Sequence, residues 1–128
     1  MNLMKVAREK LKEYFGYQEF FTDQKIILES VFKGENVLGI LPTGGGKSLC
    51  YQIPALCYSD LVVVVSPLIS LMKDQVDDLT SRGVEAAYLN STLSRSAREE
   101  VIENLANGEY DLLYVAPERF QSQPFMDV

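Results

Sequence analysis

Hydrophobic residues along the chain follow two patterns, a helical spacing and short continuous runs. Two segments with helical spacing come first, and they end at Gly16 and Gly34. Four short, largely apolar segments that are typical of strands follow, at 37–41, 61–65, 85–89 and 112–116. Because helical patterns separate these runs, the sequence predicts an α/β fold, a parallel sheet of about four strands flanked by helices on both faces.

Local signals refine three of these elements. The run 61–65 is apolar at every position, as expected of a strand that is buried on both faces. Thr22 or Asp23 can cap the second helix, because a short polar side chain accepts a hydrogen bond from the first helical turn. Pro54 is expected to kink or end the helix in which it lies, because proline has no N–H to donate.

The composition excludes several classes of protein. With 128 residues the chain is one domain at most, and 47% hydrophobic and 23% charged residues are an ordinary soluble balance. No apolar run is long enough to span a membrane, and no export signal opens the sequence. Cys50 and Cys57, in a chain without histidine, do not form a zinc site and are expected to be buried, reduced thiols of a cytoplasmic protein.

The net charge is −6, from 12 basic and 18 acidic residues. A chain that binds nucleic acid through its overall charge would be basic. The charge therefore argues against tight DNA binding by bulk electrostatics and leaves room for local contacts in a cleft.

A glycine-rich stretch between the first apolar run and a helical pattern carries the strongest candidate chemistry. Its residues are Pro42, Thr43, Gly44, Gly45, Gly46, Lys47 and Ser48. A strand, a glycine-rich turn and a helix form a phosphate-binding loop, in which backbone N–H groups and the helix N-terminus face an anion. Lys47 can reach the β- and γ-phosphates of ATP, and the Ser48 hydroxyl can bind Mg²⁺. Leu41 departs from the strict pattern, so a chance glycine-rich turn is the alternative.

Gln24 is a candidate for recognition of the base. A glutamine amide can pair bidentately with adenine, and the nearby Tyr17, Phe20 and Phe21 can stack on a base. A surface glutamine in the first turn of a helix, beside core aromatics, explains the same residues. Without further information that second interpretation is favoured.

Polar turns follow the other three predicted strands. They contain Ser66, Pro67, Asn90, Ser91, Thr92 and Arg119. In an open parallel sheet, ligands gather at the carboxyl ends of the strands, where short hydroxyls and amides suit a phosphate backbone. Spacing alone favours the simpler interpretation, ordinary helix capping and turn chemistry.

Hydrolysis of ATP needs a carboxylate that holds Mg²⁺ and usually follows an apolar strand. No predicted strand after the phosphate loop ends in Asp or Asp-Glu, and Glu118 is a weak candidate. The sequence therefore supports nucleotide binding better than hydrolysis.

Together these motifs resemble those of the RecQ family of DNA helicases. The matching residues are 42–52 for its motif I, 63–75 for its motif Ia, 89–92 and 113–119 for its next two motifs, and Phe15, Gly16, Tyr17, Phe20 and Gln24 for its motif 0. The resemblance implies a P-loop NTPase with an incomplete RecA-like sheet. Residues 1–34 would carry N-terminal helices and the adenine-binding segment, and residues 35–128 would form part of the ATP-binding domain.

The resemblance also implies roles. In this family ATP binds between two RecA-like domains, and its hydrolysis drives 3′-to-5′ movement along single-stranded DNA in repair and recombination. Gln24 would read adenine beside Tyr17. Lys47 and Ser48 would act in catalysis, and the strand-end turns would contact single-stranded or partly duplex DNA. Such a protein works at the nucleoid in bacterial cytoplasm, or in a eukaryotic nucleus.

Two departures from the family pattern change these expectations. The family usually has arginine at the position of Phe21, which can stack but has no charge. The family's Asp-Glu-x-His motif, second RecA-like domain and arginine finger would lie beyond Val128. The chain alone is therefore expected to bind ATP and Mg²⁺ without unwinding DNA, and to self-associate through an uncovered sheet edge. The alternatives are a non-catalytic nucleotide- or partner-binding module and, with no lid or acceptor site in its favour, a small P-loop kinase.

Overall fold

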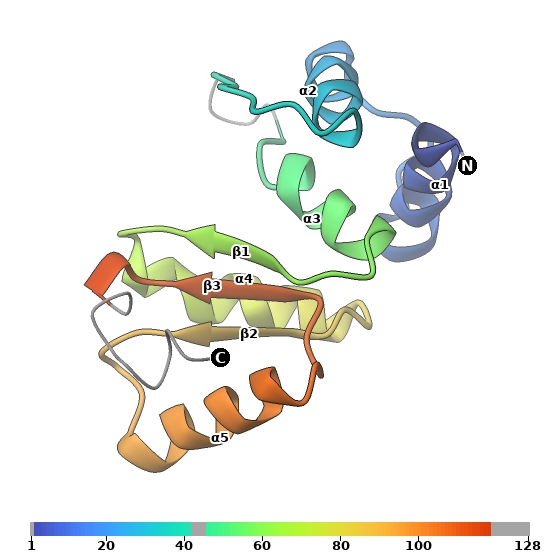
Figure 1. The fold of residues 1–128 in the computed structure, drawn as a ribbon. Coiled ribbons are helices and arrows are strands. Elements are labelled where there is room, and N and C mark those ends of the chain that lie inside the picture. Colours follow the sequence, from blue (N-terminus) through green and yellow to red (C-terminus); the bar gives the residue numbers. More distant parts are fainter. Residues whose placement is uncertain (1, 42–45, 119–128) are drawn as a thin grey trace. The chain divides into compact units, whose positions relative to one another are not determined.

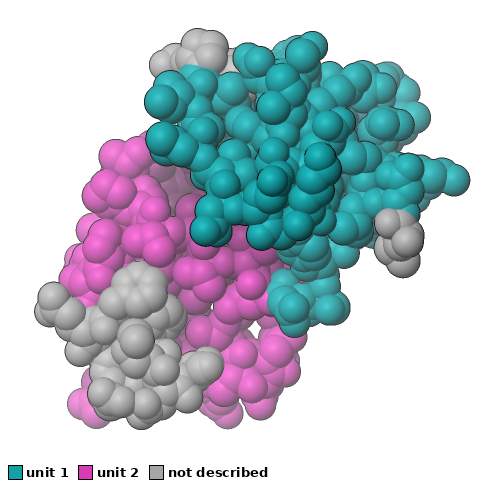
Figure 2. Space-filling model, turned by 45° about the horizontal axis from the view of Figure 1, so that its top comes forward, with its two compact units in different colours: residues 1–60 teal, residues 61–128 magenta. Residues whose placement is uncertain are grey.

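The chain divides into two compact units, residues 1–60 and residues 61–128, which Figure 2 colours separately. The computed structural model describes residues 2–41 and 46–118 of the chain (Figure 1). Each unit contains a hydrophobic core of its own.

The described part of the first unit is helical. Its elements are α1 (Leu3–Lys10), the π-helical turn η1 (Leu11–Phe15), α2 (Thr22–Phe32) and α3 (Leu49–Cys57). Gly16 and Gly34 end the first two helical segments with φ angles of 76° and 81°, a left-handed conformation that favours glycine. Both glycine stops predicted from the sequence are therefore confirmed.

The core of this unit lies among its three helices. It is formed by Ala7, Leu11, Phe20, Leu28 and Ile53, which are at most 4% exposed. These residues come from α1, η1, α2, α3 and the segment before α2, so one apolar cluster fixes the start of α2 against α3. This packing holds the polar groups of that region in place.

The structure corrects two local predictions in this unit. Phe21 precedes α2 as the N-cap residue, and neither Thr22 nor Asp23 caps the helix. Pro54 lies inside α3, which continues to Cys57, so the proline does not end the helix, and a kink at Pro54 stays a prediction. The helix tolerates this proline because burial of the neighbouring residues offsets the lost backbone hydrogen bond.

The predicted strand 37–41 is also absent. This segment forms no sheet ladder in the described structure, and Leu38 and Ile40 are 90% and 86% exposed. A strand exists only where a neighbouring strand accepts its backbone hydrogen bonds, and none of the described strands lies against this segment. The sheet therefore has three described strands where the sequence predicted about four.

The second unit is an α/β layer structure. Its elements are β1 (Val62–Val65), α4 (Ile69–Ser81), β2 (Ala86–Leu89), α5 (Arg95–Ala106) and β3 (Leu112–Val115). The strands are parallel in the order β1-β3-β2, and α4 and α5 flank the sheet (Figure 1). The predicted parallel sheet with flanking helices is confirmed.

The central strand and the edge strand differ in burial. All four residues of β3 are buried, and Leu113 and Val115 share a core with Ala87 and Leu89 beneath α5. On the edge strand β1, Val63 and Val65 are 43% and 51% exposed. The prediction that this valine run is buried on both faces is therefore wrong, because the alternating exposure of β1 shows that one of its faces is left open.

Among the described residues, no helix combines the length and the apolar character that crossing a membrane requires.

Candidate nucleotide and nucleic-acid sites

Gln24 is a buried polar residue at the start of α2. Its side chain is 2% exposed, and both ends of its amide are bonded to the backbone. The N–H of Phe21 donates to Oε1 of Gln24 at 2.8 Å, and Nε2 of Gln24 donates to the carbonyl of Gly46 at 3.1 Å. The glutamine therefore replaces the missing side-chain cap of α2 and reaches the last glycine of the predicted phosphate loop.

A cavity of about 250 Å³ opens beside this amide. It is lined by Leu11, Tyr17, Glu19, Phe21, Gln24, Gly46 and Leu49. The rings of Tyr17 and Phe21 are 58% and 63% exposed, so aromatic surface is available at the cavity. Apolar walls with a few convergent polar groups are typical of small-molecule sites.

The hydrogen-bonding capacity of Gln24 is half used. A glutamine amide has two N–H groups and an oxygen with two lone pairs, and among the described residues each end makes one hydrogen bond to the backbone. One donor and one acceptor remain, which is the pair that the edge of adenine requires. These remaining groups make Gln24 a candidate for contact with a base.

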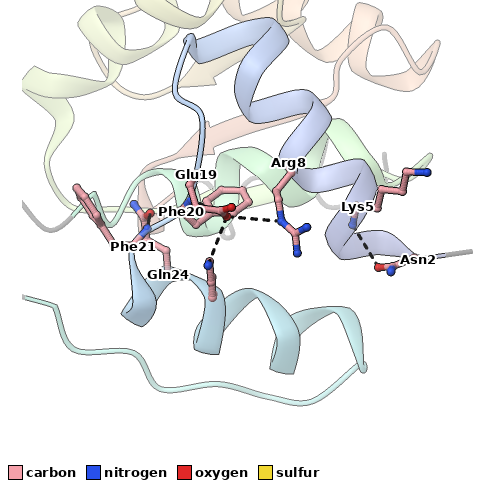
Figure 3. Close-up of polar contacts among 8 residues, drawn as sticks. Asn2, Lys5, Arg8, Glu19, Phe20, Phe21 and Gln24 are labelled. Atoms are coloured by element: carbon pink, nitrogen blue, oxygen red, sulfur yellow. Dashed lines mark hydrogen bonds and ion pairs between the residues drawn. The ribbon is translucent and has the colours of Figure 1, made fainter.

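The two phenylalanines before α2 have different positions. Phe20 is 4% exposed and belongs to the hydrophobic core, so the hypothesis that it stacks on a base is wrong. Phe21 points in a different direction (Figure 3) and lines the cavity. Phe21, which replaces the arginine usual in the resembling family, is therefore a stacking candidate together with Tyr17.

Glu19 is a residue of this region that the sequence analysis did not identify. Its Oε1 accepts the N–H of Phe20 at 3.2 Å and lies 3.5 Å from Nε of Arg8 (Figure 3). The same oxygen lies 3.5 Å from Nζ of Lys25. The Phe20 N–H, followed by Lys25 and Arg8, holds the pKa of Glu19 below its ordinary value of 4.5. No local signal marks Glu19, because its partners come from two separate helices.

The phosphate loop is described from Gly46 onward, and Pro42, Thr43, Gly44 and Gly45 lie outside the described residues. Gly46 has a φ of 73°, and its carbonyl accepts the N–H of Leu49 at 3.2 Å in addition to Gln24. Lys47 is exposed, and Ser48 is the N-cap residue of α3 without a side-chain cap bond. A helix therefore begins directly after Lys47 and Ser48, as the sequence predicted, and the phosphate loop itself stays a prediction.

Lys47 lines a second cavity, of about 320 Å³, together with Ile27, Cys50 and Tyr51 among others. The structure thus brings Tyr17, Gln24 and Gly46 to one cavity and Lys47 to another. Within the described part of the chain, no group of three or more Cys, Asp or Glu side chains can hold a metal ion. The Ser48 hydroxyl as a Mg²⁺ ligand stays a prediction.

Cys50 and Cys57 are free thiols and half-buried. Burial raises the pKa of both, to about 11 at Cys57, where Lys10 opposes the shift. High pKa values leave little thiolate at neutral pH. The two cysteines are free thiols, as predicted, but they are only partly buried, whereas the sequence predicted buried ones.

The turns that follow the strands all lie at the same end of the second unit's sheet, where the carboxyl ends of its parallel strands meet. The N–H of Ser66 donates to the carbonyl of Val115 at 3.0 Å, and the N–H of Ala116 donates to that of Leu89 at 3.1 Å, so the parallel ladder continues into the turns. The exposed residues there are Pro67, Ser91 and Thr92, whereas Asn90 is 1% exposed and Ser66 is partly buried. Glu118 is exposed after β3, and Arg119 lies outside the described residues.

Comparison with known proteins identifies the class of protein to which the chain belongs. Residues 21–126 match the DEAD/DEAH box helicase family, and because the match covers most of the chain, the chain belongs to that family. It is also similar in fold to the DUF1998 helicase MrfA in a crystal structure with DNA and AMPPNP, with a TM-score of 0.73 and 22% identity over 96% of this chain and 18% of that one.

Two RecQ helicases are more similar to the chain in sequence than MrfA is. The chain is 47% identical over 122 residues to the ATP-dependent DNA helicase RecQ of Haemophilus influenzae, which covers 95% of this chain and 20% of that protein. It is 47% identical over 123 residues to RecQ of Bacillus subtilis, covering 95% and 21%. The resemblance to RecQ helicases is thus confirmed, and the chain spans about a fifth of the length of these relatives.

Proposed function

We propose that the chain is the ATP-binding portion of a 3′-to-5′ DNA helicase similar to RecQ. The observation that carries this proposal is the Gln24 amide, which bonds the carbonyl of Gly46 and lines the same cavity as the aromatic rings. A base-sized cavity joined to a glycine-rich, Lys-Ser loop is what a nucleoside triphosphate requires at its two ends.

The residues present fit ATP. Tyr17 and Phe21 would stack on adenine, and the spare donor and acceptor of Gln24 would pair with its edge. Lys47 would neutralise phosphate charge, and the N–H groups of the loop would bind phosphate oxygens. The Ser48 hydroxyl would hold Mg²⁺, whose charge would offset that of the phosphates.

A second candidate is nucleotide binding without turnover by this chain. The residues directly after β1, β2 and β3 are Ser66, Asn90 and Ala116, so none of the described strands is followed directly by a carboxylate. Glu118 is two residues further on and exposed. This favours a chain that binds ATP and leaves efficient hydrolysis to groups outside the described residues.

We further propose that the turns after the strands contact the backbone of single-stranded or partly duplex DNA. Exposed hydroxyl groups and backbone N–H groups at the carboxyl ends of the strands support this, since such groups bind phosphate oxygens without recognising the DNA sequence. The net charge of −6 means that these contacts, rather than overall attraction, would supply the affinity. The same function places the protein at the chromosome.

The exposed valines of β1 support self-association of this chain as well. Val63 and Val65 lie on an edge strand with one described neighbour, and such edges pair with other chains.

The proposal is tested by titrating the chain with a fluorescent ATP analogue and Mg²⁺, beside Lys47→Ala. Lys5→Ala, an exposed lysine of α1, is the matched control. We expect at least a tenfold loss of affinity for Lys47→Ala and no change for the control.

Phosphate release with single-stranded DNA then separates the two candidates. Lys47-dependent binding without release would support the second candidate, whereas DNA-stimulated release would show that the chain contains the carboxylate it needs. Equal affinities of the unaltered chain and Lys47→Ala would refute the phosphate-loop assignment.

A further inference from the structure

Asn90 is a buried amide whose hydrogen bonds are internal to the fold. Its side chain is 1% exposed, and its Oδ1 accepts both the N–H of Thr92, at 2.8 Å, and the Thr92 hydroxyl. Its Nδ2 donates to Sδ of Met72 at 3.4 Å. An amide used in this way at both ends has little capacity left for a ligand.

These bonds connect two elements at the carboxyl ends of the strands. Met72 is 2% exposed and belongs to α4, the helix that begins directly after the turn at Ser66. In that turn the N–H of Leu68 donates to Oγ of Ser66 at 3.1 Å. Asn90 therefore connects the turn after β2 with the helix that follows the turn after β1.

The hydroxyl groups of these turns differ in whether their proton can still be donated to a ligand. The Thr92 hydroxyl proton is directed at Asn90, so it is not available to a phosphate. Ser66 uses its oxygen as an acceptor and keeps its hydroxyl proton. Ser91 is exposed, and no hydrogen bond to its side chain forms among the described residues. Among the candidate hydroxyls that the structure describes in these turns, those of Ser91 and Ser66 thus remain able to donate.

We propose that Asn90 is a positioning residue that holds the turn 90–92 so that Ser91 donates its hydroxyl to a nucleic-acid phosphate. This inference rests on the proposed DNA contact of the strand-end turns and divides their residues by role. Ser91, with Ser66, contacts the phosphate backbone. Asn90 and Thr92 form the scaffold, and Asn90 acts through Ser91.

The test is a double-mutant cycle on binding of a fluorescein-labelled oligo(dT) at low ionic strength. Ser91→Ala removes the hydroxyl at an exposed position, and we expect it to weaken binding about fivefold. Asn90→Ala should weaken binding to a similar extent in the unaltered chain and by less than twofold in the Ser91→Ala background. Thr80→Ala, on the exposed face of α4, is the control and should leave the affinity unchanged.

Met72→Leu keeps the cycle decisive if Asn90→Ala unfolds. It removes the sulfur acceptor of the Asn90 amide and nearly conserves volume, so the core is retained. We expect about a twofold loss of affinity that disappears in the Ser91→Ala background. Thermal unfolding of each variant separates loss of positioning from loss of fold.

The outcomes distinguish this inference from the function on which it rests. Losses that do not add support positioning through Ser91. Additive losses, or a loss for Asn90→Ala beside an unchanged Ser91→Ala, overturn the role of Asn90 and leave DNA binding intact. If the unaltered chain shows neither anisotropy change nor chemical-shift change at Ser66 and Ser91 with millimolar oligo(dT), the DNA contact itself is refuted.

Discussion

Gln24 and Gly46 are 22 positions apart in the sequence, and the amide of the first donates to the carbonyl of the second at 3.1 Å. The same amide accepts the N–H of Phe21 at the start of α2. The proposed base pocket and the proposed phosphate loop are therefore connected by one buried side chain. A change at either residue should be felt at the other.

Gln24→Glu tests the donor role of this side chain. Glutamate keeps an oxygen for the Phe21 N–H, but its carboxylate cannot donate to the Gly46 carbonyl or to a base. We expect about a tenfold loss of affinity for the fluorescent ATP analogue at pH 7.5, equivalent to about 1.4 kcal/mol. Gln18→Glu, an exposed change of equal charge in the preceding segment, is the control. Equal affinities for the two variants would show that Gln24 does not contact the nucleotide.

Gly46→Ala tests the close approach of loop and glutamine. A Cβ at Gly46 would overlap Nε2 of Gln24, and its φ of 73° strains any residue with a Cβ. Gly34→Ala is a matched control, because Gly34 has a φ of 81° and open space where its Cβ would lie.

Both alanine variants should lose about 1–2 kcal/mol of unfolding free energy, measured in urea. Only Gly46→Ala should also lose nucleotide affinity, because only there is Gln24 displaced. A parallel loss of affinity in Gly34→Ala would mean that general destabilisation, rather than the contact, weakens binding.

Glu19→Gln tests how the stability of the fold depends on pH. The folded state lowers the pKa of Glu19, so the ionised carboxylate stabilises the fold at pH values above its ordinary pKa of 4.5. That contribution is lost as the pH falls through the folded-state pKa, where the carboxylate takes up a proton. The variant should therefore be less stable than the unaltered chain at pH 7, and the difference should disappear in acid.

Denaturant unfolding from pH 7 to pH 3 measures this difference. Glu9→Gln, an exposed carboxylate of α1, is the control and should show no comparable pH dependence. A stability difference for Glu19→Gln that stays constant across the range would contradict the explanation that the ionised carboxylate is stabilised by the Phe20 N–H, Lys25 and Arg8.

Local rules predicted much of this fold, and long-range contacts decided the rest. Gly16 and Gly34 end their helices because a left-handed residue is a local requirement. The segment 37–41 has the composition of a strand, but a strand needs a partner that local sequence does not specify. Composition also cannot tell that Phe20 enters the core while Phe21 lines the cavity, because the direction of the chain before α2 sets that difference.

The candidate site divides in the same way. Lys47 and Ser48 were identifiable because a phosphate loop is a continuous motif. Glu19 was not, since Arg8 and Lys25 reach it from different helices. Asn90 was identified as a polar strand-end residue, but only the structure shows that its amide is buried and bonded to Met72.

Val65→Lys tests the exposed edge of β1. Val65 is 51% exposed on a strand with one described neighbour, and a lysine on an edge strand opposes pairing with another chain because its charge would have to be desolvated. We expect the unaltered chain to show a concentration-dependent increase in mass by sedimentation velocity and the variant to remain monomeric. Thr80→Lys adds the same charge on the exposed face of α4 and should associate like the unaltered chain. If both lysine variants reduce association equally, net charge rather than the β1 edge controls association. If the unaltered chain is monomeric at every concentration, the β1 edge does not mediate self-association.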